Sequence, residues 1–495
     1  MVASGGNQRL PRSTPEAFGV EPGAVTAFLE AAEATGQELH SFMLLKRGTV
    51  IAEGSWQPYE AGRKRLSNSV SKSFTSAAIG MAVAEGKLSI EDTVVSFFPG
   101  ELPEQPDPKL AGMRVKHLLT MSTGHDVDTV VPVLKSGETD WVRAFLALPL
   151  AYEPGTVFKY NTGATYMLSA IVQRVTGERL VDYLRDRLFA PLGIEHPVWG
   201  SCPSGITAGG WGLSLTTEEM ARFGQLYLQN GQWKGKQLIP AEWVSASVSP
   251  QMSNGDDSDS DWSAGYGYQF WCNRYGTYRA DGAFGQIILV MPAEEAVLAF
   301  TSSLSDLSQI LNAVWAQLLP ALLKGSPSLP DDGRALAALR SKTDSLAIVP
   351  PAASGVPGHF AHHEEYRFED NALGLVSLRL HGEDEGCVIE WMLDGTLNRL
   401  EAGGEDWAVS QWPSAPEVYH ADAKPVPADA AAVGRWQEDG SYLIAIRLLD
   451  TAYHDTVHVR FEEEGHVSVT FARKFSVTPL HIGTLHAHPA QAASR

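Results

Sequence analysis

The sequence predicts a mixed α/β (α+β) domain followed by a smaller, mostly β domain. Between about residue 20 and residue 325, amphipathic helical patterns alternate with strand-like runs, whereas short runs of alternating apolar and polar residues prevail toward the C-terminus. The chain has 495 residues, more than one hydrophobic core usually serves, and 44% of them are apolar. We therefore expect two domains, each with a core of its own.

The first domain is expected to span residues 10–325. An amphipathic helix in VEPGAVTAFLEAAEATG is followed by a hairpin in SFMLLKRGTVIAEGSW, whose turn is the tight segment KRG. Residues 69–85 then form a second helix, because apolar residues recur at helical spacing and Gly86 is well placed to end it. Ser69 stands at the N-terminal edge of this helix.

A change in composition separates the two domains. Residues 326–357 are expected to form a linker, because KGSPSLPDDG and PPAASGVPG are rich in proline and glycine and flank one short helical stretch. The second domain, residues 358–485, contains the strand-like runs VSLRL, CVIEWML and YLIAIRLLD and a hairpin in VHVRFEEEGHVSVTF. The closing segment HAHPAQAASR is expected to be a frayed tail.

Charge and cysteine content narrow the range of partners. A formal net charge of -20 and an isoelectric point near 5.2 argue against a nucleic acid or an anionic membrane surface, since both bind basic patches. Three widely spaced cysteines suggest neither a disulfide framework nor a zinc site. With no apolar N-terminal leader and no apolar stretch long enough to span a bilayer, the sequence predicts a cytoplasmic protein.

Ser69 and Lys72, in the segment LSNSVSKSFTSAAIG, are the first candidates for chemistry. Residues three apart lie on one face of a helix, so the hydroxyl and the amine are expected to be neighbours. Serine is a weak nucleophile at neutral pH and needs a base, and lysine serves as one only when its amine is kept partly neutral, for example by burial. The unpaired N–H groups at the start of the helix would stabilise negative charge beside Ser69. The alternative interpretation is an N-cap serine with a solvated lysine.

Further motifs follow this pair in order along the chain. EPGTVFKYNTGATYMLSAIVQRVTG places Tyr160 before an amphipathic helix, and AGGWGLSLTTEEMARFGQ and YRADGAFGQIILVMP come later. Over roughly residues 10–325, the ordered set resembles the serine β-lactamase and penicillin-binding-protein superfamily, in its class C-like branch of esterases, amidases and D-aminopeptidases. The resemblance implies a β-lactamase-like antiparallel sheet flanked by helices, with a helical subdomain.

The first two motifs of this family are S-x-x-K and Y-x-N. Ser69 and Lys72 match the first motif completely. The segment YNT places Tyr160 correctly but puts Thr162 where the family has asparagine. The resemblance implies that Ser69 is the acylated nucleophile and that Lys72 and Tyr160 share the movement of its proton.

The third motif is altered as well. Family members carry lysine or histidine, one further residue and then glycine on the edge strand of the sheet, whereas ADG places Ala280 at the basic position and keeps Gly282. Without that cation a substrate carboxylate would lack its partner, so β-lactamase and DD-carboxypeptidase activities are disfavoured relative to cleavage of neutral esters or amides. Arg279 is expected to point away from Ser69, because adjacent strand residues face opposite sides.

The resemblance also implies where a substrate lies. The backbone N–H groups of Ser69 and Ala283 would form the oxyanion hole, with Gly282 letting the strand approach the substrate closely. The residues expected to contact substrate are Thr162, Trp211, Ala280, Asp281 and Gly282, although Trp211 is equally well explained as a core aromatic. No metal ion or organic cofactor is required, and the expected partner is a small ester or amide.

Two other groups of residues suggest chemistry less strongly. His125 and Asp126 invite a Ser/His/Asp triad, but the chain has no G-x-S-x-G elbow to supply its serine. Histidine clusters at residues 359–363 and 486–488 can ligate metals, yet they fall at the linker and the tail and lack the rigid spacing of a metal site. We expect neither group to be functional.

The leading hypothesis is a serine hydrolase that acts on small esters or amides. A D-amino-acid-specific amidase or peptidase, or a peptide cyclase, is the alternative within the same mechanism. The departures at Thr162 and Ala280 also permit a catalytically inactive scaffold for binding or assembly, although folding alone would not require Ser69, Lys72 and Tyr160 together. The sequence does not give the oligomeric state.

Overall fold

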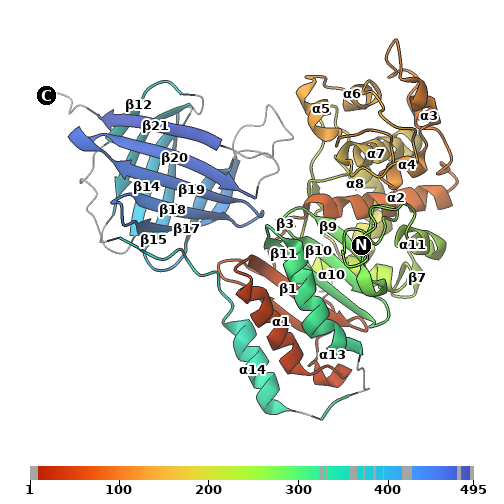
Figure 1. Ribbon diagram of the computed structural model, residues 1–495, viewed down its shortest axis with the longest axis horizontal. Coiled ribbons are helices and arrows are strands. Elements are labelled where there is room, and N and C mark those ends of the chain that lie inside the picture. The colour runs from red at the N-terminus through yellow and green to blue at the C-terminus, as the bar shows by residue number, and fades with distance from the viewer. Residues whose placement is uncertain are drawn as a thin grey trace, which may run out of the picture. The chain divides into compact units, whose positions relative to one another are not determined.

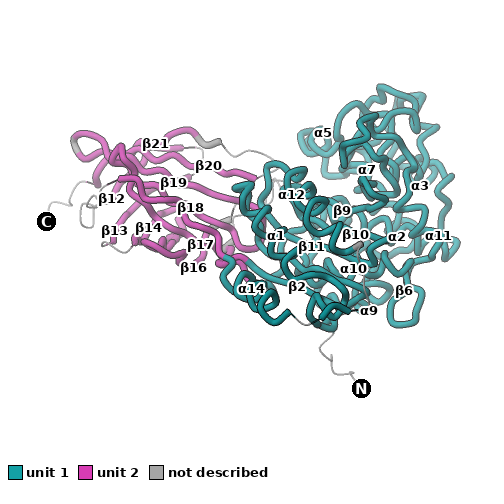
Figure 2. The backbone as a smooth tube through the Cα atoms, turned by 60° about the horizontal axis from the view of Figure 1, so that its bottom comes forward, with its two compact units in different colours: residues 1–55, 61–346 teal, residues 56–60, 347–495 magenta. Residues whose placement is uncertain are grey.

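The computed structural model of the chain divides into two compact units, coloured separately in Figure 2. Unit 1 comprises residues 1–55 and 61–346, and unit 2 comprises residues 56–60 and 347–495. The structure describes residues 9–323, 328–330, 332–355, 365–371, 374–382, 386–393, 395–414, 426–475 and 481–490. Each unit has its own main sheet (Figure 1). Each also has its own set of buried apolar residues.

A six-stranded antiparallel sheet forms the centre of unit 1, in the order β2-β1-β11-β10-β9-β8. Its strands are β1 (Glu38–Lys46), β2 (Thr49–Ser55), β8 (Trp271–Cys272), β9 (Tyr278–Gly282), β10 (Gln286–Met291) and β11 (Ala296–Ser303). The predicted hairpin supplies β1 and β2, and β1 then pairs with β11 from the far end of the unit. Strands distant in sequence therefore meet in one sheet.

Helices cover this sheet because both of its faces are apolar. β10 and β11 are buried along their whole length, which requires cover on both sides. The helices concerned include α1 (Pro22–Ala34), α10 (Thr217–Leu228), α12 (Leu307–Ala313), α13 (Leu319–Leu323) and α14 (Gly333–Asp344). α10 packs on β10 and β11, while α1 packs with α12 and α14.

A helical subdomain surrounds α2 (Ser71–Ala84). The other helices of this subdomain are α3 (Val94–Phe97), α4 (Val115–Leu119), α5 (Val130–Lys135), α6 (Trp141–Leu146), α7 (Thr162–Thr176) and α8 (Leu180–Leu184). α2 contacts α7 and α8 and also β9. Its small residues let neighbouring elements approach from several sides, so nearly the whole helix is buried.

Shorter elements complete unit 1. They are α9 (Ala190–Leu192), α11 (Ala241–Ser247), β3 (Arg65–Leu66), β4 (Val198–Trp199), β5 (Leu213–Leu215), β6 (Gln232–Trp233) and β7 (Lys236–Gln237). β3, β4 and β5 form a small second sheet, and Ser67 donates its backbone N–H to the carbonyl of Leu213 at 2.8 Å. This sheet fixes the chain just before Ser69.

Unit 2 is a ten-stranded barrel. Its strands are β12 (Glu365–Phe368), β13 (Leu375–His381), β14 (Gly386–Leu393), β15 (Thr396–Gly403), β16 (Ala408–Ser414), β17 (Val426–Trp436), β18 (Tyr442–Leu448), β19 (His454–Phe461), β20 (Val467–Lys474) and β21 (His481–Pro489). Neighbouring strands pair antiparallel in the order β15-β14-β13-β12-β21-β20-β19-β18-β17-β16, and a parallel bridge between Gly403 and Val433 closes the sheet.

The predicted fold class is confirmed, since unit 1 is a mixed α/β structure with an antiparallel sheet and unit 2 is built of strands. The prediction of a frayed C-terminal tail is wrong for residues 486–489. They belong to β21, which lies between β12 and β20 and thereby joins the first strand of the barrel to a later one. The histidines at 359–363 lie outside the described residues.

Two further findings concern the whole chain. Cys202, Cys272 and Cys387 are free and buried. Among the described residues, each helix is too short or too polar to cross a lipid bilayer.

Two glycines in helices give a matched test of this packing. A Cβ at Gly80 of α2 would lie 2.4 Å from the ring of Trp243, whereas a Cβ at Gly23 of α1 would meet nothing within 4 Å. We expect Gly80→Ala to lower the free energy of unfolding by about 1–3 kcal/mol through overpacking. Gly23→Ala is expected to leave it unchanged or raise it by up to about 1 kcal/mol. Urea denaturation measures both, and equal stability of the two variants would contradict the packing described around α2.

Candidate active site

Ser69 lies in a 3₁₀ turn, η2 (Asn68–Val70), that leads directly into α2. Asn68 has a left-handed backbone conformation with a φ of 48°, which asparagine adopts more readily than most residues. Its side-chain amide donates to the carbonyl of Ala283 at 3.0 Å, and its carbonyl accepts from the Ser71 hydroxyl at 2.6 Å. The turn that carries Ser69 is thereby tied to α2 and to the end of β9.

The amine of Lys72 lies among three oxygen atoms. Nζ is 2.9 Å from Ser69 Oγ, 2.9 Å from the carbonyl oxygen of Gly210 and 3.3 Å from Thr162 Oγ1. The side chain is buried, with 1% of its surface exposed. The structure therefore brings the serine and the lysine together at hydrogen-bond distance, as the spacing of three residues predicts.

Burial changes the protonation of this amine. Desolvation lowers the pKa of Lys72 to about 7, and the negative charges of Asp128 and Asp281 oppose this effect only in part. A substantial fraction of the amine is then neutral near pH 7. A neutral amine at 2.9 Å from Ser69 Oγ can accept the proton of the hydroxyl.

Tyr160 completes the group around Ser69. Ser69 acts on the pKa of the Tyr160 hydroxyl, and the Lys72 amine lies 4.9 Å from the centre of the Tyr160 ring. Desolvation raises the pKa of Tyr160 well above its ordinary value, and the neighbouring Ser69 hydroxyl offsets only part of that increase. The phenol therefore remains protonated, so it can donate a proton and Lys72 is the better base.

Aromatic side chains hold the ring of Tyr160. Trp271 of β8 stacks on it with centroids 5.6 Å apart and an interplanar angle of 23°, and Tyr266 meets it edge-on at 6.3 Å. Phe158 contacts both Tyr266 and Trp271. Tyr160 precedes α7 in a segment without regular secondary structure, so this packing takes the place of backbone regularity in fixing its orientation.

The start of α7 presents Thr162 to Lys72. Asn161 is the N-cap of this helix, and its side-chain oxygen accepts from Thr129 Oγ1 at 2.6 Å and from the backbone N–H of Ala164 at 3.3 Å. The carboxylate of Asp128 accepts from the backbone N–H of Thr162 at 2.8 Å. The asparagine of YNT thus serves the helix end, while the threonine hydroxyl faces the amine.

β9 lies close against the turn that carries Ser69. A Cβ at Gly282 would approach the carbonyl oxygen of Ser67 to 2.3 Å, so a larger residue would push the strand away. Ala283 follows and is bound through its carbonyl to Asn68. The pairing of the Ser69 and Ala283 N–H groups as an oxyanion hole stays a prediction that this close approach favours.

The third motif brings an ion pair near the site. Ala280 is buried and carries no charge. Arg279 and Asp281 lie on one face of β9, because they are two residues apart. They form an ion pair with 2.7 Å between Arg279 Nε and Asp281 Oδ2. That Arg279 points away from Ser69 stays a prediction. The charge of Arg279 acts on Tyr160, and that of Asp281 acts on both Tyr160 and Lys72. The bonded partner on the same face directs the guanidinium toward the aromatic side chains around Tyr160.

Trp211 is connected to the site through its neighbour. The preceding residue, Gly210, accepts a hydrogen bond from Lys72. The indole of Trp211 is buried and stacks on that of Trp141, with ring centroids 6.0 Å apart. The backbone carbonyl of Trp211 accepts a hydrogen bond from Trp199 Nε1 at 2.8 Å. These contacts describe a core aromatic that fixes the Gly210 carbonyl.

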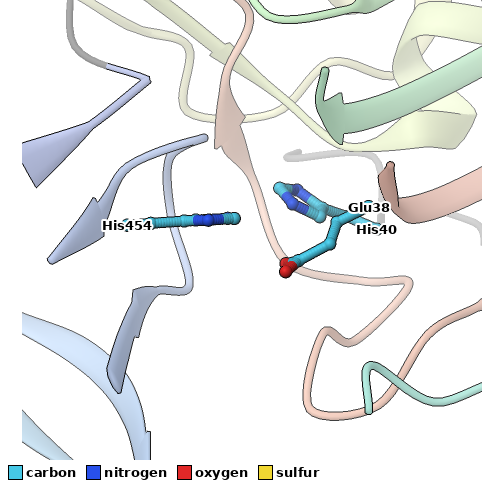
Figure 3. A group of neighbouring side chains, drawn as sticks. All are labelled: Glu38, His40 and His454. Atoms are coloured by element: carbon cyan, nitrogen blue, oxygen red, sulfur yellow. The ribbon is translucent and has the colours of Figure 1, made fainter. Parts of the chain in front are cut away.

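His125 and the residues that Figure 3 draws are further candidates for chemistry. His125 is buried, contacts Thr123 Oγ1 at 2.9 Å, and has its pKa lowered to about 4 by desolvation. Figure 3 draws Glu38 and His40 of β1 with His454 of β19, which belongs to the other unit. Within unit 1, His40 is buried and bonds Ser303 at 3.0 Å. We assign neither group a role in catalysis.

Sequence reasoning missed several residues that complete the site. They are Asp128, Gly210 and Trp271, which contact or influence Lys72 and Tyr160, and Arg279, to which sequence reasoning gave no part in the site. Asp128 had a usable signal, because an acidic residue just before the apolar run VVPVLK is typical of a helix N-terminus. Trp271 and Arg279 lie more than 100 residues from Tyr160 in sequence, and no local pattern connects them.

Comparisons with known proteins identify the family of the chain. The family model for Beta-lactamase matches residues 30–319. Over 290 residues the chain is 27% identical to 6-aminohexanoate-dimer hydrolase of Paenarthrobacter ureafaciens. The matched residues make up 54% of this chain and 73% of that protein. Over 172 residues it is 27% identical to an Escherichia coli K12 protein provisionally named D-alanyl-D-alanine carboxypeptidase, covering 32% of this chain and 39% of that one.

A solved structure is similar in fold. It is a Bacillus anthracis protein provisionally named 6-aminohexanoate-dimer hydrolase, with a TM-score of 0.53 and 21% sequence identity over 65% of this chain and 89% of that one. Since the family model matches more than half of the chain, the chain belongs to the β-lactamase family of hydrolases.

Proposed function

We propose that the protein is a serine hydrolase that cleaves small ester or amide bonds through an acyl-Ser69 intermediate. The observation that carries this proposal is the buried amine of Lys72, 2.9 Å from Ser69 Oγ. An exposed lysine would be protonated at neutral pH and would not accept the proton of serine. An inactive scaffold would not need a desolvated amine at this distance.

In the first half of the reaction, Ser69 Oγ attacks the substrate carbonyl carbon while Lys72 accepts the hydroxyl proton. The carbonyl oxygen becomes an oxyanion, held by the N–H groups of Ser69 and Ala283. The bond to the leaving group then breaks as the Tyr160 hydroxyl donates its proton, and Lys72 returns its proton to the phenolate. Water repeats these steps on the acyl-enzyme and releases the acid, which restores Ser69.

The charges near the site favour substrates without a carboxylate at the scissile end. Ala280 supplies no cation, and Asp128 and Asp281 place negative charge within reach of Lys72. The relative named 6-aminohexanoate-dimer hydrolase acts, by its name, on a dimer of an amino acid. An amide is the bond expected between two amino acids, which supports amides as well as esters. The relative provisionally named D-alanyl-D-alanine carboxypeptidase keeps a D-amino-acid amidase or peptidase as the second candidate.

Labelling of Ser69 tests the acyl-enzyme. We expect a fluorophosphonate to add one adduct per chain, mapped to Ser69 by peptide mass, and p-nitrophenyl acetate to be turned over. Ser69→Ala should abolish the adduct and lower kcat at least about a thousandfold, because the nucleophile is lost. Intact-protein mass and release of p-nitrophenol measure the two effects. A folded protein that neither labels nor turns over ester or amide substrates would favour the scaffold.

The pH dependence tests Lys72 as the base. Because the pKa of Lys72 is lowered to about 7, kcat/KM is expected to rise about tenfold per pH unit below 7 and to level off above it, as the amine loses its proton. Lys72→Met should lower kcat about 10²–10⁴-fold. Lys46→Met is the matched control, because Lys46 is also buried but its amine binds the carbonyls of Glu294 and Leu322. It should keep the wild-type midpoint, and a flat wild-type profile would rule out this base.

Substrate charge tests the altered third motif. We expect hydrolysis of neutral p-nitrophenyl acetate to exceed that of the anionic β-lactam nitrocefin by at least about a hundredfold in kcat/KM, because an unpaired carboxylate is costly to bury. D- and L-alanine p-nitroanilides compare the amide and stereochemical alternatives in the same assay. Nitrocefin turnover as fast as that of the ester would overturn the proposed preference.

A further inference from the structure

Arg279 is held in place by hydrogen bonds that two of its nitrogen atoms donate. It is wholly buried, with 0% of its surface exposed. Nε donates to Asp281 Oδ2 at 2.7 Å, while Nη1 donates to the backbone carbonyl of Asp261 at 2.9 Å and to the side-chain oxygen of Asn273. A planar guanidinium bound on several sides has little freedom to rotate. Arg279 therefore joins β9 to the segment from Asp261 to Asn273.

That segment carries the aromatic residues that reach the site. The guanidinium of Arg279 lies 4.4 Å from the ring centre of Trp262 and 5.4 Å from that of Trp271. The two indoles meet edge to face at 4.9 Å with an interplanar angle of 85°. Asn273, which Arg279 binds, is two residues beyond Trp271. Arg279 thus fixes the indole of Trp271 in two ways: it binds the neighbouring Asn273, and its guanidinium lies over the indole ring.

Trp271 in turn determines where the ring of Tyr160 lies. The two rings stack with an interplanar angle of 23°. To take part in the reaction, Tyr160 must present its hydroxyl to Ser69, and a shift of about 1 Å in a catalytic group costs on the order of a hundredfold in rate. The charged or polar groups that act on Tyr160 from the surrounding elements are Ser69, Lys72, Asp128, Arg279 and Asp281.

We propose that Arg279, held by Asp281, is a positioning residue of the catalytic centre: it fixes the indole of Trp271, which orients Tyr160 toward Ser69. This inference rests on the proposed function, since it assigns Tyr160 a part in the reaction. It accounts for a buried ion pair beside a site that lacks the expected cation at Ala280. Buried ion pairs are often no more stabilising than apolar residues of the same volume, so stability alone is a weak reason for this one.

A double-mutant cycle tests the connection. We expect Arg279→Met and Trp271→Leu each to lower kcat for p-nitrophenyl acetate about tenfold to a hundredfold. KM should change less than about threefold, because the proposal gives both residues a part in orienting Tyr160 and none in binding the ester. If Arg279 acts through Trp271, the double variant should lose no more than the worse single variant. Losses that multiply in the double variant, or an unchanged kcat in folded Arg279→Met, would overturn the proposal.

Conservative variants separate positioning from general damage. Trp271→Phe keeps a ring for Tyr160 and is expected to retain at least about a third of kcat, whereas Arg279→Lys, which cannot reach all three acceptors, should remain impaired. Arg222→Met is the matched control: Arg222 is buried in α10 and donates to the carbonyls of Leu192 and Gly193. It should leave kcat within about twofold even if it lowers the melting temperature. A loss of kcat equal to that of Arg279→Met would overturn the proposal.

Labelling of Ser69 distinguishes this proposal from the function on which it rests. Wild-type protein that carries no fluorophosphonate adduct would remove the proposed function itself. Wild-type protein that labels, together with an Arg279→Met variant that labels and turns over at the wild-type rate, would remove only the positioning role. If Arg279→Met does not fold, Trp271→Leu against Trp271→Phe decides, since equal kcat for that pair would show that no ring at this position is needed.

Discussion

Burial of the Lys72 amine is the constraint on which the rest of unit 1 depends. The same desolvation that lowers its pKa would be too costly if the amine lacked partners, and Ser69, Gly210 and Thr162 provide them. Each of these three oxygen atoms comes from a different part of the chain. The turn before α2, the loop before β5 and the start of α7 must therefore all be in place before the serine has its base.

The central helix makes this convergence possible. α2 is buried on nearly every side, because small residues let α7, α8 and β9 approach it together. Gly282 serves the same end at the last residue of β9, since any Cβ there would meet the carbonyl of Ser67. Close packing, with glycine at the tightest points, sets the distances of the site. The side chains of the reaction are common ones, and their environment makes them reactive.

The fold class, the first helix, the first hairpin and the pair Ser69 and Lys72 follow local patterns, so they are predictable from the sequence. The oxygen partners of Lys72 are not. Gly210 contributes a backbone carbonyl, which every residue has, and Asn161 turns its side chain to the helix end while Thr162 takes the place beside the amine. The tail is a similar case, because residues 486–489 become a strand only through pairing with β12 and β20.

The sequence by itself determined the family motifs, the spacing that makes Ser69 and Lys72 neighbours, and the loss of the cation at Ala280. Those features reside in residues close together in the chain, where helical and strand periodicities fix geometry. Only the tertiary structure decided that Lys72 is desolvated, that Trp271 stacks on Tyr160 and that Arg279 lies with Asp281 behind them. Desolvation and long-range packing depend on which distant segments cover a side chain, and one sequence does not carry that information in any local pattern.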